Sequence, residues 1–79
     1  MPSNTFIPGT TKTTEIGYIN RNNQCCCGHR GIPGNDYGQF AYQMKCLESS
    51  CGHIYGANGT DVFQRKCPIC QKGKQGIDF

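Results

Sequence analysis

Four cysteines in the C-terminal half constrain the fold of this chain more than any other feature. Their spacing is C-x4-C, fifteen further residues and then C-x2-C, at Cys46, Cys51, Cys67 and Cys70. Each pair can turn its backbone around one ion, so that two sulfurs come from each of two turns. Closed four-thiolate sites are typical of structural zinc. The spacing therefore predicts a metal-stapled fold with one structural Zn²⁺ bound by these four residues.

The composition indicates why a chain of this kind needs a metal. It has 79 residues, of which 35% are hydrophobic and 11 are glycine, and it contains no tryptophan. Ordering a chain costs about 1.5 kcal/mol per residue, and so small an apolar inventory leaves little net stability. A structural zinc site contributes on the order of 10 kcal/mol of binding energy that is also folding energy. We therefore expect the metal-free chain to be partly or wholly unfolded.

Cysteine usage favours a reducing compartment over a secreted disulfide framework. The seven cysteines are odd in number, and Cys25, Cys26 and Cys27 are consecutive. Residues 1–14 lack the apolar run of a signal peptide. No stretch approaches the roughly 20 apolar residues that cross a membrane. We expect a soluble cytoplasmic protein with no membrane partner, whose oligomeric state the sequence leaves open.

The chain shows short β patterns and no helical face of ten or more residues. Residues 1–14 are rich in threonine and proline and are expected to form a flexible arm before a single domain at 15–79. Residues 15–19 and 25–27 would be the strands of a hairpin, and 28–38, with four glycines, an extended loop.

The clearest strand covers residues 39–46. Phe40, Tyr42, Met44 and Cys46 alternate with smaller or polar residues, so the large side chains share one face and Cys46 stands at the strand end. Residues 62–66 are either a third strand or a helical turn capped by Thr60 or Asp61. The predicted fold class is small and mostly β, zinc-ribbon-like, with short hairpins and long glycine-rich loops.

The remaining cysteines and the two histidines leave alternatives open. Cys25, Cys26 and Cys27 are structural strand residues, or Cys25 and Cys27 join His29 in a second metal site, or they carry thiol chemistry. His53 follows Cys51 closely and either replaces it as a ligand or packs beside the site. The five carboxylates are scattered, so the sequence assigns no catalytic or cofactor-binding residue. A small nuclease or thiol enzyme is thus a third class of function, behind binding modules.

Positive charge gathers around the second cysteine pair. The formal net charge is +3, and half of the eight cations flank Cys67 and Cys70: these are Arg65, Lys66, Lys72 and Lys74. Such residues can contact phosphates, and an aromatic ring such as Tyr55 or Phe63 can stack on unpaired bases. We expect a non-enzymatic module that binds DNA or RNA. The alternatives are a merely solvated basic surface, or a protein-interaction adaptor that docks through the Phe40–Met44 face or the 31–34 loop.

Three segments carry a resemblance to a protein family. The stretch CGHIYGANGTDVFQRKCPICQKG, from Cys51 to Gly73, resembles the C-terminal zinc-ribbon signature of small standalone bacterial proteins of unassigned function. GYINRNNQ (17–24) and GIPGND (31–36) resemble further signatures of that family, so the similarity covers about residues 16–77. The resemblance implies a ribbon fold and a bacterial or mobile-element origin. The first turn departs from the usual C-x2-C of zinc ribbons, because it is enlarged to C-x4-C.

Overall fold

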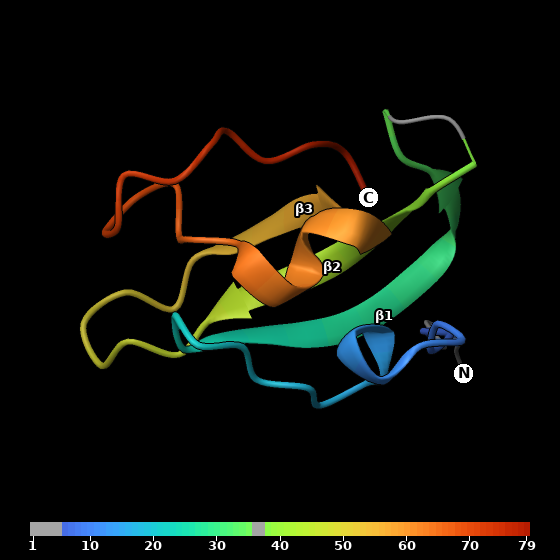
Figure 1. The fold of residues 1–79 in the computed structure, drawn as a ribbon. Helices are drawn as coiled ribbons and strands as arrows, with labels where there is room; N and C mark the ends of the chain where they lie inside the picture. Colours follow the sequence, from blue (N-terminus) through green and yellow to red (C-terminus); the bar gives the residue numbers. More distant parts are fainter. Residues whose placement is uncertain (1–5, 36–37) are drawn as a thin grey trace, which may run out of the picture.

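The fold is a small antiparallel β-sheet with two short 3₁₀ helices. The structure is a computed structural model that describes residues 6–35 and 38–79. Within these residues the sheet has three strands in chain order, β1 (Gln24–Pro33), β2 (Phe40–Cys46) and β3 (Ile54–Asn58). The helices are η1 (Lys12–Thr14), beside β1, and η2 (Gly59–Gln64), which crosses the sheet (Figure 1). The predicted mostly-β class is confirmed.

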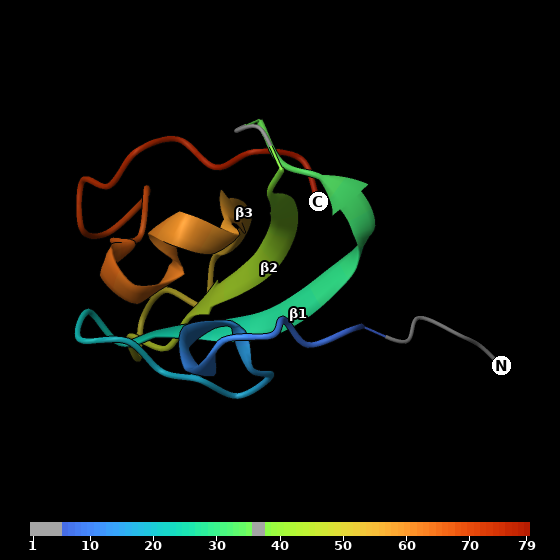
Figure 2. The ribbon, with the colours of Figure 1, turned by 45° about the vertical axis from the view of Figure 1, so that its right-hand side comes forward.

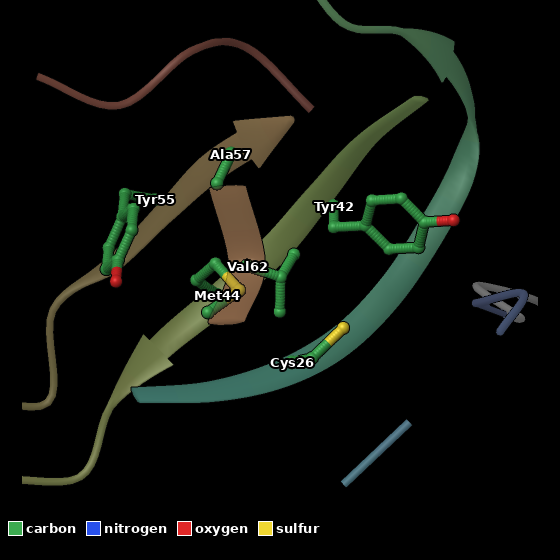
Figure 3. Close-up of a cluster of buried hydrophobic side chains, with 6 residues drawn as sticks. All are labelled: Cys26, Tyr42, Met44, Tyr55, Ala57 and Val62. Atoms are coloured by element: carbon green, nitrogen blue, oxygen red, sulfur yellow. The ribbon is translucent and has the colours of Figure 1, made fainter. Parts of the chain in front are cut away.

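Strand β2 organises the sheet, and it begins one residue later than the predicted segment. Met44 is paired with Cys26 on β1 and with Tyr55 on β3. Because directly paired residues point to the same face of a sheet, these three side chains share one face. Figure 3 shows that they meet Val62, which comes from η2. Tyr42 and Ala57 complete this buried cluster.

The helix η2 resolves the alternative left open for residues 62–66. Residues 62–64 belong to the 3₁₀ helix and residues 65–66 follow it, and the N-cap is Asn58 rather than Thr60 or Asp61. Val62 is completely buried, whereas Phe63 on the next position is exposed. The two turns of this helix insert one apolar side chain, that of Val62, into the core.

Strand β1 is longer than predicted, because its glycines bend the strand without ending it. The expected loop at 28–38 is strand up to Pro33, and the pairing register shifts on both sides of His29. Gly28 and Gly31 have φ of +95° and +82°, a left-handed conformation that glycine adopts without a steric penalty. The loop prediction was therefore wrong for residues 28–33.

The predicted strand at 15–19 is also wrong. The segment forms turns, although the Cys26 amide donates to the Tyr18 carbonyl at 2.8 Å and Ile19 makes an isolated bridge with Cys25. Ile16 and Ile19 are both about half exposed. The β-branched residues therefore have no buried face that would favour a continuous strand.

Both ends of the described chain are held against the sheet. Ile7 and His29 exchange two backbone hydrogen bonds of 2.8 and 2.9 Å, and Thr14 in η1 is buried, so residues 7–14 pack on β1. Residues 7–14 of the predicted arm are therefore part of the fold, and its residues 1–5 lie outside the described part. The C-terminal segment runs back beside β3 (Figure 2), where the Ile77 amide donates to the Gly56 carbonyl at 3.0 Å. No helix in the described ranges is long and apolar enough to span a membrane.

Candidate metal centre

The four predicted cysteines converge at one end of the sheet. Their Sγ atoms all lie within 4.8 Å of one another. The Sγ atoms of Cys46 and Cys70 are 3.6 Å apart, as are those of Cys51 and Cys67. Zn–S bonds of about 2.3 Å in a tetrahedron place sulfurs about 3.8 Å apart. The cluster can therefore hold a metal ion in a closed four-thiolate cage.

The enlarged first turn still brings its two cysteines together. Cys46 is the last residue of β2, and its amide donates to the His53 carbonyl at 2.9 Å, which closes the base of the loop. Within the loop the Cys51 amide donates to the Glu48 carbonyl at 3.0 Å. Gly52 has a φ of +72°, a left-handed angle that lets the chain turn back toward β3. The extra residues widen the turn while its closing hydrogen bond keeps both sulfurs in place.

The second turn is compact and closes on Cys67. The Cys67 carbonyl accepts hydrogen bonds from the amides of Gln71 at 3.1 Å and Gly73 at 3.0 Å. The Ile69 amide donates to the Cys67 Sγ at 3.4 Å. Backbone donors of this kind stabilise thiolate charge around a metal.

Two glutamines form hydrogen bonds to the cysteines of the cage, and neither role was predicted from the sequence. Gln24 is completely buried; its Nε2 donates to the Cys46 Sγ at 3.2 Å and its Oε1 accepts from the Tyr55 hydroxyl at 2.8 Å. Gln71 Oε1 accepts from the Cys67 amide at 2.8 Å, and its Nε2 donates to the Asn22 carbonyl at 2.8 Å. The sequence held one signal: Gln24 lies two residues before the core residue Cys26, on the same strand face.

The environment of Cys46 favours its ligating form. Burial favours the neutral thiol, but hydrogen bonds from the Gln24 side chain, the Glu48 backbone and the neighbouring Cys70 and Cys51 thiols together lower the pKa of Cys46 to about 7. Thiolates are the metal-binding form of cysteine. Burial also raises the pKa of Tyr55 to about 12, so its hydroxyl keeps the proton that it donates to Gln24.

The other cysteines and His29 lie apart from the cage. In the described ranges the four-cysteine group is the one cluster of three or more metal-ligating side chains. Cys26 is buried in the core, while Cys25 and Cys27 are half-buried. His29 stacks on Phe40 with ring centroids 4.1 Å apart, and its Nδ1 accepts from the Gly31 amide at 2.9 Å. The structure thus does not assemble Cys25, Cys27 and His29 into a second metal site.

His53 packs beside the site. Its ring stacks on Tyr55 with centroids 5.8 Å apart and planes inclined by 14°. It is not one of the four clustered ligands. The packing role weighed from the sequence fits this placement better than substitution for Cys51.

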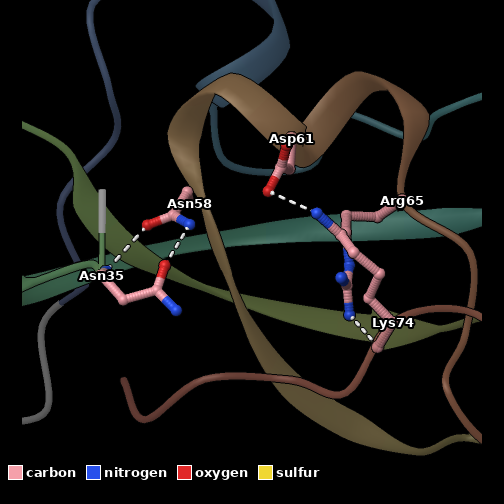
Figure 4. Close-up of polar contacts among 5 residues, drawn as sticks. All are labelled: Asn35, Asn58, Asp61, Arg65 and Lys74. Atoms are coloured by element: carbon pink, nitrogen blue, oxygen red, sulfur yellow. Dashed lines mark hydrogen bonds and ion pairs between the residues drawn. The ribbon is translucent and has the colours of Figure 1, made fainter. Parts of the chain in front are cut away.

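The four predicted phosphate-contacting residues differ in exposure. Lys66, Lys72 and Lys74 are exposed, but Arg65 is only 4% exposed. Its Nη2 donates to the Lys74 carbonyl at 2.7 Å (Figure 4), and its guanidinium lies 5.0 Å from the centre of the Tyr55 ring. Arg65 therefore does not fit the expected role of an exposed phosphate contact.

These four cations line one cavity, which we call the basic cavity. It has a volume of about 250 Å³ and is completed by Asp61, Gln64 and Gly73. The Lys74 Nζ lies 3.5 Å from the Asp61 carboxylate in an exposed ion pair (Figure 4). The cavity thus contains four cations and one carboxylate.

Comparisons of the chain with protein-family models, with curated proteins and with solved structures found no match. The functional interpretation therefore rests on the arrangement of the residues. Its clearest element is the closed sulfur cluster, followed by the basic cavity beside the second cysteine turn.

Proposed function

We propose that this protein is a zinc-stapled, non-enzymatic binding module that contacts nucleic acid through the lysines beside its metal cage. The observation that carries the proposal is the convergence of the Cys46, Cys51, Cys67 and Cys70 Sγ atoms within 4.8 Å. Four thiolates leave no open position for a substrate or water, which is the pattern of structural rather than catalytic zinc. Iron also accepts four thiolates, but zinc is the usual ion in ribbon-like turns.

The binding part of the proposal rests on exposed charge at a stiffened turn. Lys66 precedes the second cysteine pair, and Lys72 and Lys74 follow it, so all three side chains reach solvent near one metal-held turn. Phe63 is 41% exposed, with the Arg21 guanidinium 5.9 Å from the centre of its ring. Lysines contact phosphate without reading sequence, and an exposed ring can stack on an unpaired base. Single-stranded nucleic acid is the ligand class that uses both. Membership of the bacterial zinc-ribbon family and a cytoplasmic location belong to the same proposal.

A charge-matched pair of variants tests the nucleic-acid part. In Lys66→Gln/Lys72→Gln the affinity for single-stranded DNA and RNA should fall similarly for all sequences. The slope of log K against log salt should become shallower by about 1.4, since each single-strand phosphate contact contributes about 0.7. Fluorescence anisotropy across a salt series measures both quantities. The control Lys12→Gln/Lys45→Gln removes the same charge from exposed positions outside the basic cavity. Equal losses in both variants, or no binding by the unmodified protein at low salt, would refute this function.

A further inference from the structure

We propose that the basic cavity is an oxyanion site that binds one phosphate group, with Arg65 as its buried anchor. This site extends the proposed function. It rests on that function in one respect, because the phosphate would come from a nucleic-acid backbone. A volume of about 250 Å³ is below the roughly 300–1,000 Å³ of pockets for drug-sized ligands. The cavity therefore suits a small anion or one group of a larger molecule.

The strongest indication is an arginine whose charge is buried without a matching anion. Arg65 is 4% exposed, and its Nε has no hydrogen-bond partner in the described part of the chain. Its Nη2 bonds a neutral carbonyl, that of Lys74. No carboxylate among residues 6–35 and 38–79 forms an ion pair with it. Burying an uncompensated charge is costly, so this position favours a bound anion.

The charges around Arg65 also favour a bound anion. Asp61 is paired with Lys74, and the exposed side chains of Lys66 and Lys72 line the cavity with no carboxylate paired to them in the described ranges. A guanidinium offers a planar fork of donors that matches two phosphate oxygens, and ammonium groups bind the same anion as point charges. The cavity therefore combines the buried guanidinium of Arg65 with the exposed ammonium groups of Lys66 and Lys72.

Lys72 adds a backbone observation. Its φ is +57°, one of two left-handed values at non-glycine positions in the described chain. A residue with a Cβ pays about 1–2 kcal/mol for this conformation. Strained backbone conformations are often found at ligand-binding sites, where the surrounding structure maintains them. Asparagine tolerates the same backbone angles, so Lys72→Asn removes the charge without adding strain.

The metal cage offers a competing account of Arg65. Four thiolates around a divalent ion carry a formal charge of −2, and Arg65 lies two residues before Cys67. Arg65 also stacks on Tyr55, which is bonded through Gln24 to Cys46. If compensation of the cage were its whole role, removing Arg65 would weaken metal binding and leave phosphate binding unchanged.

Titration of the zinc-loaded protein with inorganic phosphate tests the site. Calorimetry or amide chemical shifts should show saturable binding, weakened roughly tenfold in Lys72→Asn, the loss expected for one charged hydrogen bond. The thermal midpoint of that variant should stay unchanged or rise. Lys45→Asn, at an exposed position outside the cavity, should bind phosphate as the unmodified protein does. Absence of saturable binding, or equal affinities in Lys72→Asn and the unmodified protein, would overturn the proposal.

Two further arms separate the alternatives. Arg65→Met should weaken phosphate binding in protein that still holds its zinc; loss of zinc affinity alone, with phosphate binding intact, would assign Arg65 to the cage and reject the site. Competition between inorganic phosphate and an oligonucleotide would identify the backbone phosphate as the occupant. Phosphate binding without oligonucleotide binding would support the oxyanion site and reject the nucleic-acid function, so the two proposals fail separately.

Discussion

Replacing Cys67 with serine should abolish the cooperatively folded state at room temperature. The side chain is completely buried, and its Sγ lies 3.6 Å from that of Cys51. The substitution removes one of four ligands and leaves a hydroxyl that binds zinc poorly. Structural zinc sites supply about 10–16 kcal/mol of binding energy, whereas the buried apolar cluster of the described residues comprises six side chains. Dispersion of amide resonances in a two-dimensional NMR spectrum reports the outcome directly.

The matched control for this variant is Cys25→Ser. Cys25 is a half-buried cysteine outside the sulfur cluster, so its replacement should leave the spectrum dispersed and the metal content unchanged. A Cys67→Ser protein that melts cooperatively within a few degrees of the unmodified protein would show that the apolar core alone holds the fold. In that event the cysteines would be dispensable for stability.

Gln24→Leu should weaken both the fold and the metal site, although Gln24 is not one of the four predicted ligands. Leucine fills a similar volume but leaves the Tyr55 hydroxyl and the Cys46 Sγ without their present partner. Each buried polar group left unpaired costs about 1–3 kcal/mol. Loss of a group that supports a metal ligand lowers metal affinity by about 10–100-fold. We therefore expect the free energy of unfolding to drop by about 3 kcal/mol and zinc competition assays to show the weaker affinity.

A control and a double-mutant cycle make the assignment specific. Gln43→Leu changes a half-buried glutamine on β2. In the described chain, Gln43 makes no hydrogen bond with the cage sulfurs, unlike Gln24. It should leave zinc affinity unchanged. Tyr55→Phe removes only the hydroxyl, so its cost should overlap with that of Gln24→Leu in the double variant. Additive costs, or equal zinc affinities in Gln24→Leu and Gln43→Leu, would remove Gln24 from the metal centre.

The metal ligands and strand β2 could be predicted because their signals are local. Two cysteines a few residues apart can reach one ion whatever the rest of the chain does, and the alternation from Phe40 to Cys46 matches the period of a strand. The structure bears out both, with the four sulfurs clustered and β2 ending at Cys46.

The remaining features depend on contacts between distant segments. Gln24 reads as a turn residue until strand pairing places it opposite Cys46. Arg65 is predicted to be exposed from its sequence context. It is buried because the chain after Cys70 folds back over it, where the Lys74 carbonyl accepts its hydrogen bond. The glycines of β1 read as loop residues because composition does not reveal that a neighbouring strand will hold them. In each case a partner more than eight residues away decides the outcome.

Native mass spectrometry after treatment of the folded protein with iodoacetamide tests whether one ion holds the four cysteines, because it counts bound metal and reactive thiols on the same chain. We expect one zinc per chain with at most two adducts, at the half-buried Cys25 and Cys27. Cys46, Cys51, Cys67 and Cys70 should be protected by the ion until a chelator removes it. A folded, metal-free chain in which those four cysteines are alkylated as readily as Cys25 and Cys27 would contradict the proposed zinc cage.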